Sequence, residues 1–570
     1  MALMSEDEIK QDQWDSMEEE LVPENVKSSL HYSSNGGTNN LHEMHSGLAL
    51  NIEQDNDNKE QVSLTSSKTN CTNDPDDPPV RCFRSEAITI MISLVIGAVT
   101  GFGVSVFKLS IEHLSDFIYG MHVSAIVGGK DHGDHMRIPA IIIPAVGGLF
   151  VSLLRLFGPD PPGLRAQVAE VNEELNMSYS SVATTPDDED GSFTENTTPR
   201  RSPFAYGRKF LEAVCTLGTG NSLGPEGTAV EVGIATSRIL MGMNRLRNKL
   251  RITKQEQKLF LACGAAAGVS AGFNAPISSV FFAFEIVQAA FNAESCHEFG
   301  IQTTSKESLS SRQSVAPIMV AAVASAMVTR AILKDHMTLI LSSYSLTSPL
   351  VELPLYVLLG SLAGVVAFSF SQLSKAITKA YAGNGPRWTQ LTIAKLPSFW
   401  HPVSGGLLCG LIGKFFPQVL FFGYESLNNL LANKTMPTWM LLSLLAAKTV
   451  ATAISVGSGL VGGLFAPSLF LGSMLGASIH NMASALLMHV NRFFGWTPGG
   501  VFSISDVPAY TMVGAASTLA ALFQAPLTGS LLVFELTHSY DVILPLLTAA
   551  GVGSLVNDVV THKYKSRSRS

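Results

Sequence analysis

Residues 264–285 read GAAAGVSAGFNAPISSVFFAFE, and residues 514–535 read GAASTLAALFQAPLTGSLLVFE. The two stretches align without a gap at an offset of 250 residues, and both carry Phe-x-Ala-Pro and end in Phe-Glu. Alanine and glycine match by chance in low-complexity sequence, whereas this ordered pair of motifs does not. The sequence therefore contains an internal repeat.

A second pair of segments lies upstream of the first in each half. Residues 218–228 read GTGNSLGPEGT and residues 457–467 read GSGLVGGLFAP, so that three glycines coincide and Glu226 falls opposite Phe465. Because the order of the two pairs is the same in both copies, we predict two homologous halves, at 81–292 and 314–558, that form an inverted repeat. Proteins built from such repeats commonly bind their substrate where the halves meet.

Composition gives the class of protein. Hydrophobic residues make up 46% of the 570 residues and charged residues 15%, against about 25% charge in an ordinary soluble domain. Thr449–Asn491 is 43 residues long and has no Asp, Glu, Lys or Arg. These features exclude a soluble enzyme, a disordered scaffold and a nucleic-acid binder. They predict an all-α polytopic membrane protein whose glycine- and proline-interrupted segments form discontinuous helices.

Polar segments flank and divide the apolar body. Residues 1–80 hold 17 acidic residues against four lysines, which predicts a disordered acidic tail. Polar loops are predicted at 176–203 and 293–313, and a short basic tail at 559–570. Arg238–Lys258 carries seven basic residues and one acid, and the positive-inside rule assigns it and both termini to one cytoplasmic-type side. The six cysteines are scattered without metal or disulfide spacing, and we predict no metal and no cofactor.

Three carboxylates in the apolar body differ in their sequence context. Glu226 is flanked by glycines at a predicted helix N-terminus, where the helix dipole favours a negative charge. An acid in an apolar segment is costly and usually marks a transport pathway, so we predict that Glu226 occupies an anion site and acts as its gate. Glu285 and Glu535 recur in both halves, which favours structural acids that accept backbone hydrogen bonds.

The glycines of 218–227 have alternative explanations. They let backbone N–H groups approach a small anion, or they serve only for close helix packing. A phosphate loop is excluded because no strand–helix–strand pattern and no Gly-Lys-Ser/Thr surrounds them.

These motifs, in this order, resemble the CLC family of chloride channels and anion/proton exchangers over about residues 85–558. The resemblance rests on Gly-Pro-Glu-Gly at 224–227, Gly-Gly-Leu-Phe-Ala-Pro at 462–467 and the duplicated Phe-x-Ala-Pro segments. It implies a homodimer with one anion pathway in each subunit. It also implies that Glu226 is the gating glutamate, and that the anion is held at Gly227, Leu464 and Phe465.

Four departures from the family pattern matter. Pro162, followed by Gly163, stands where the first anion motif of the family has serine, and such a proline accompanies nitrate preference in plant members. Ile286 occupies the position of an inner acid used for protons. Tyr564 is the only candidate for the family's anion-binding tyrosine, out of register by about two residues. The sequence stops at Ser570, where many relatives continue into nucleotide-binding regulatory domains.

The resulting prediction is transport of chloride or nitrate through a lipid bilayer. Channel-like conduction is favoured because Ile286 cannot bind a proton, and a proton-coupled exchanger is the alternative. An intramembrane enzyme or a non-conducting interaction protein is more remote, since His480 and His489 are isolated and no nucleophile–base pair is evident. Pro162 and the short C-terminus suggest, by analogy, an organelle membrane of the chloroplast or the Golgi and endomembrane system.

Overall fold

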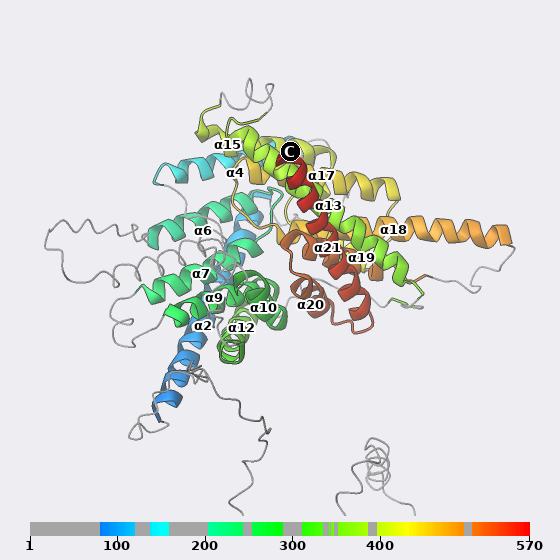
Figure 1. The fold of residues 1–570 in the computed structure, drawn as a ribbon. Coiled ribbons are helices and arrows are strands. Elements are labelled where there is room, and N and C mark those ends of the chain that lie inside the picture. The colour runs from blue at the N-terminus through cyan, green and yellow to red at the C-terminus, as the bar shows by residue number, and fades with distance from the viewer. Residues whose placement is uncertain are drawn as a thin grey trace, which may run out of the picture. The chain divides into compact units, whose positions relative to one another are not determined.

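The computed structural model describes residues 80–119, 137–158, 203–242, 254–288, 311–333, 341, 344–346, 351–385, 396–494 and 504–569 (Figure 1). The described part is helical, and its only β-type pairing is an isolated bridge between Gly224 and Gly463. The predicted all-α fold is thereby confirmed. Nearly all of the predicted tail 1–80 and of the predicted loop 176–203 lies outside the described residues.

The helices of the first part of the chain are α2 (Val80–Tyr119), α4 (Arg137–Arg155), α6 (Pro203–Gly218), α7 (Glu226–Met241), α9 (Lys254–Phe273), α10 (Pro276–Phe282), the π-helix η2 (Ala283–Gln288) and α12 (Ser311–Leu333). Those of the second part are α13 (Leu353–Tyr381), η3 (Ser398–Trp400), α15 (His401–Phe415), η4 (Pro417–Val419), α16 (Tyr424–Leu431), α17 (Thr438–Gly457), α18 (Phe465–Phe494), α19 (Val507–Phe523), α20 (Pro526–Thr537) and α21 (Ile543–Arg569).

The repeated Phe-x-Ala-Pro motif forms the same helix break in both halves. α9 and α19 end before Asn274 and Gln524, whose φ angles are 59° and 58°. A proline then starts the next helix, α10 or α20, where its missing N–H costs no hydrogen bond. The preceding alanines also agree, with φ/ψ of −127°/80° in one half and −134°/77° in the other. Sequence identity at this break therefore corresponds to identity of backbone conformation.

The duplicated glutamates join α10 to α20. Glu285 accepts hydrogen bonds from the backbone N–H groups of Leu527 and Thr528 at 3.0 and 2.7 Å, and from the Thr528 hydroxyl at 2.6 Å. Glu535 accepts hydrogen bonds from the N–H groups of Ile277 and Ser278 at 3.0 and 2.9 Å. Each half thus satisfies the free N–H donors at the start of the other half's short helix.

Two boundaries differ from those that the sequence suggested. α12, most of which we assigned to the second half, packs against α2 and α9 of the first half. The boundary between the two groups of helices therefore falls after α12, because α12 is buried against the first group, and most of the predicted loop 293–313 lies outside the described residues. Likewise, α21 continues as one helix to Arg569 through the basic residues of the predicted tail 559–570.

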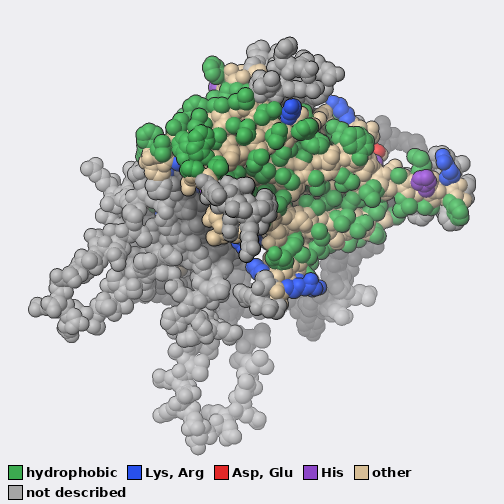
Figure 2. Space-filling view, turned by 90° about the horizontal axis from the view of Figure 1, so that it is seen from above, with side chains coloured by type: hydrophobic (Ala, Val, Ile, Leu, Met, Phe, Trp, Pro, Cys, Tyr) green, Lys and Arg blue, Asp and Glu red, His purple; other side chains and the backbone are tan. Residues whose placement is uncertain are grey.

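The described surface suits a bilayer. Six described helices are long and apolar enough to cross a membrane: Glu86–Tyr119, Val315–Leu333, Leu353–Tyr381, Thr438–Gly457, Phe465–Phe493 and Ile543–Arg567. Figure 2 shows hydrophobic side chains over most of the described surface on that face, with few charged groups between them. Apolar surfaces of this extent, with few charges, are stable against lipid and unstable against water.

Candidate functional site

The duplicated glycine segments meet in space. The N–H of Gly224 donates to the carbonyl of Gly463 at 2.9 Å, and the N–H of Gly463 donates to the carbonyl of Gly224 at 2.6 Å. A Cβ at Gly227 would lie 2.6 Å from the Cα of Gly463, so only glycine permits this approach. The two backbones therefore run in contact immediately before α7 and α18 begin.

Glu226 and Phe465, which the repeat alignment places opposite each other, are the first residues of α7 and α18. The first N–H groups of each helix have no partner within that helix, and both helix dipoles direct partial positive charge to this point. A methyl group at Gly224 would collide with Oε2 of Glu226 and lie 3.3 Å from the backbone nitrogen of Ala466. The carboxylate of Glu226 therefore lies beside the N-terminus of the other half's helix.

The side chain of Glu226 is almost fully enclosed, at 2% exposure. The hydroxyl of Tyr424 donates to Oε1, whereas Oε2 has no hydrogen-bond partner among the described residues. Lys108 of α2 acts on the carboxylate as a positive charge and donates hydrogen bonds to the carbonyls of Ala271 and Gly272 at the end of α9. A buried carboxylate with one oxygen unsatisfied is held less firmly than one whose oxygens are all paired.

An aromatic cluster forms the other side of the site. Phe465 is 4% exposed, and its ring stacks on Phe523 with centroids 4.2 Å apart. The rings of Phe273 and Phe282 lie 5.7 and 5.9 Å from it. Phe273 and Phe523 are equivalent in the repeat, so both halves contribute apolar groups around the start of α18. These rings give the space next to the start of α18 an apolar wall.

The remaining predicted residues are placed as follows. Leu464 directly precedes α18 and packs into the apolar core. Ile286 lies in η2, partly buried against the core, and η2 is a π-helix, a feature that is frequent at functional sites. Pro162 and Gly163 lie outside the described residues.

Tyr564 does not join the residues at the start of α7 and α18. It is 52% exposed near the end of α21, with its ring 5.6 Å from that of Phe368. The tyrosine that contacts Glu226 is Tyr424, which our sequence reasoning did not identify. Nothing near Tyr424 repeats between the halves, and its contact with Glu226 spans 198 residues.

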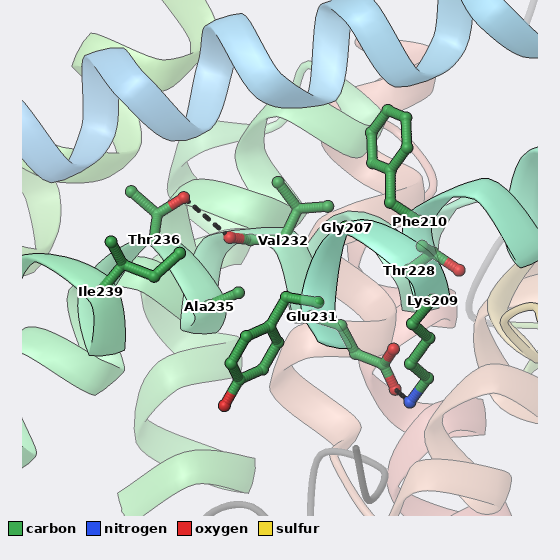
Figure 3. Close-up of a pocket in the computed structure, with 10 residues that line it drawn as sticks. Gly207, Lys209, Phe210, Thr228, Glu231, Val232, Ala235, Thr236 and Ile239 are labelled. Atoms are coloured by element: carbon green, nitrogen blue, oxygen red, sulfur yellow. Dashed lines mark hydrogen bonds and ion pairs between the residues drawn. The ribbon is translucent and has the colours of Figure 1, made fainter. Parts of the chain in front are cut away.

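A cavity of about 190 Å³ lies on another side of α7 (Figure 3). Lys209 and Glu231 form an ion pair of 2.8 Å at its wall, and Thr228 reaches it from two residues after Glu226. Its other lining residues are Tyr206, Gly207, Phe210, Val232, Ala235, Thr236 and Ile239. Glu226 does not line this cavity, so we do not include the cavity in the candidate site.

Comparison with known proteins gives consistent matches. The family profile described as voltage gated chloride channel matches residues 192–558. The chain is 33% identical over 494 residues to chloride channel protein CLC-e of Arabidopsis thaliana, which covers 85% of this chain and 61% of that protein. It is 36% identical over 366 residues to CLC-f of the same plant, covering 63% of this chain and 42% of that protein. The chain thus spans less than two thirds of the length of either relative.

Bacterial proteins and solved structures match as well. The H(+)/Cl(-) exchange transporter ClcA of Salmonella agona is 27% identical, with 80% of this chain and 83% of that protein covered. A slow cyanobacterial Cl-/H+ antiporter has a similar structure, with a TM-score of 0.61 at 20% identity, over 83% of this chain and 94% of that one. A eukaryotic CLC transporter gives a TM-score of 0.58 at 17% identity, over 83% and 71%. At these identities the structural likeness concerns the fold.

Proposed function

The chain belongs to the voltage gated chloride channel family, and we propose that it moves small monovalent anions, chloride or nitrate, across a membrane with Glu226 as the gate. The observation that carries this proposal is the buried carboxylate of Glu226 at the meeting point of two helix N-termini. Donors that suit a carboxylate also suit a small anion. A permeating anion and the ionised carboxylate therefore compete for the same donors.

Protonation supplies the means of opening. A neutral carboxyl group is attracted less by helix dipoles and by Lys108 than an ionised one, so it leaves the site more readily. Oε2, which has no hydrogen-bond partner among the described residues, lowers the cost of leaving further. Gly227, Leu464 and Phe465 would then present their backbone N–H groups to the anion. We infer that conduction rises as the pH falls.

Passive, channel-like conduction is our first candidate. A proton that crosses a membrane needs titratable groups along its path. Glu226 supplies one, whereas Ile286 supplies none at the position where relatives have an inner acid. A proton-coupled exchanger is the second candidate, favoured by the similarity to ClcA, whose name describes exchange of H⁺ and Cl⁻. We further propose a homodimer with one pathway in each subunit, in an organelle membrane, both from the family resemblance.

The test is anion flux in liposomes that contain the purified protein. We expect flux of chloride and nitrate, and a reversal potential that stays near zero when a pH gradient is applied with anions held symmetric. A reversal potential that scales with the pH gradient would establish exchange and remove the channel interpretation. Absence of flux from folded protein for both anions would overturn the proposal of transport itself.

A further inference from the structure

A tyrosine from the second half is bound to the carboxylate at the start of α7. Tyr424, the first residue of α16, donates its hydroxyl proton to Glu226 Oε1. Glu226 is buried and Tyr424 is partly buried, so that water has limited access to the bond. A hydrogen bond with an ionised partner is stronger than a neutral one, and more so at low dielectric. Glu226 is thus tied to the half of the molecule that does not contain it.

A buried lysine fixes the segment that leads to Tyr424. Lys448 of α17 is fully buried, and its Nζ donates to the carbonyls of Val419 and Phe421 at 2.9 and 2.8 Å. The same ammonium lies 5.3 Å from the ring centre of Phe470. A buried ammonium is stable only with its N–H groups paired, so these carbonyls are held firmly in place. The backbone just before Tyr424 is therefore rigid.

The backbone of this segment also contacts the loop before α7. The N–H of Phe421 donates to the carbonyl of Gly220 at 3.2 Å. Gly423 has a φ of 87°, and a Cβ there would lie 2.5 Å from Cδ2 of Phe470. Only glycine fits this position, and it turns the chain into α16 at one defined angle. The backbone of residues 419–423 therefore has little conformational freedom, and it holds the hydroxyl of Tyr424 next to Glu226.

We propose that Tyr424 is a positioning residue that latches Glu226 in the closed position, and that the pathway opens when this hydrogen bond breaks. The inference rests on the proposed role of Glu226 as the gate. A donating hydroxyl favours the ionised carboxylate over the protonated one. Protonation of Glu226 therefore weakens the latch at the same moment as it weakens the attraction to the helix N-termini. Lys108 is the other charged side chain that acts on Glu226 among the described residues.

The experiment measures anion flux against pH for Tyr424→Phe in liposomes. Without the donor, the carboxylate accepts a proton at higher pH, so the pH of half-maximal flux should rise by about one unit or more, and flux at neutral pH by about tenfold. Tyr119→Phe is the matched control. Its hydroxyl donates to the carbonyl of Thr219 at 2.9 Å, near the same loop but not to Glu226. That variant should keep the pH midpoint of the original protein.

A double variant separates the latch from the gate. In the Glu226→Ala background, Tyr424→Phe should cause no further change in pH dependence. If Glu226→Ala alone keeps its pH dependence, the gate assignment fails and the latch with it. If Glu226→Ala loses pH dependence but Tyr424→Phe behaves like Tyr119→Phe, only the latch is overturned. Should Tyr424→Phe not fold, Tyr424→Leu removes the same hydroxyl and must show the same upward shift.

Discussion

The two duplicated regions of this molecule have diverged to different degrees. The breaks between α9 and α10 and between α19 and α20 keep the same proline, a residue in the same left-handed conformation (Asn274 or Gln524) and the same terminal glutamate. The glycine segments before α7 and α18 keep their backbone geometry, with φ of 86° at Gly220 and 89° at Gly459. Yet one helix begins with Glu226 and the other with Phe465. The two halves therefore share the backbone conformation at this point, but only the first half has a carboxylate there.

The three carboxylates Glu226, Glu285 and Glu535 also differ in their hydrogen bonds, according to whether the acid occurs in both halves or in one. Glu285 and Glu535 each accept two backbone hydrogen bonds, and both oxygens of each are used. Glu226 is more deeply enclosed, and only one of its oxygens has a partner among the described residues. A carboxylate with both oxygens paired loses more hydrogen bonds when it moves than one with a single oxygen paired. We therefore expect Glu285 and Glu535 to stay in place during transport and Glu226 to be the acid that moves.

Removing the asymmetric acid should have the largest effect on transport. We expect Glu226→Ala to conduct at least as well as the original protein at every pH and to lose its pH dependence, because no side chain is left to titrate at the site. Glu226→Gln, which resembles the protonated side chain, should keep flux near its low-pH value throughout. The measurement is anion flux between pH 5 and 8. If Glu226→Ala kept normal pH gating, Glu226 would not be the gate and would not differ in function from Glu285 and Glu535.

Substituting a symmetric acid should instead act on stability. In Glu285→Gln or Glu535→Gln, one oxygen becomes an amide that faces a backbone N–H, so each should lower the free energy of unfolding by about 1.5–3 kcal/mol, the worth of hydrogen bonds to a charged group. Glu285→Gln should cost more, because Glu285 also binds the Thr528 hydroxyl. Thermal unfolding in detergent reports the loss. We expect the pH midpoint of flux to stay unchanged, and a large shift would mean that these acids take part in gating.

Features of the fold and of the site could be predicted where they depend on a local sequence pattern, and could not where they depend on contacts between residues distant in sequence. The repeat, the helix breaks and the exceptional position of Glu226 were visible because each is a local pattern of glycine, proline or charge. Tyr424 and Lys448 were not, since their roles arise from contacts with residues far away in sequence. The assignment of α12 failed for a related reason: a polar loop resembles a boundary, but the contacts of an apolar helix decide which group it joins.

The paired glycines offer a finer test of the asymmetry. A Cβ at Gly224 collides with Glu226 Oε2 and lies 2.9 Å from the Cβ of Ala466, whereas one at Gly463 collides with the backbone at Gly227. We expect Gly224→Ala to push the carboxylate aside and to raise flux at neutral pH. Gly463→Ala should destabilise the protein by about 1–3 kcal/mol without raising the flux per folded molecule. Flux per folded protein, measured with thermal unfolding, separates the two outcomes, and identical behaviour of both variants would count against the asymmetry.

The smallest effect is expected from Pro162, which lies outside both duplicated regions. If the backbone donors at α7 and α18 dominate anion binding, a donor added elsewhere should tune selectivity and leave gating unchanged. Proline offers neither an N–H nor a hydroxyl, so Pro162→Ser adds donors, and chloride, being more strongly hydrated than nitrate, gains more from them. At about 0.5–1.5 kcal/mol for one hydrogen bond, the nitrate-to-chloride permeability ratio should fall about two- to tenfold. Bi-ionic reversal potentials measure this ratio, with Pro161→Ser as the neighbouring control that should leave it unchanged. An unaltered ratio in Pro162→Ser would leave selectivity to the helix N-termini alone.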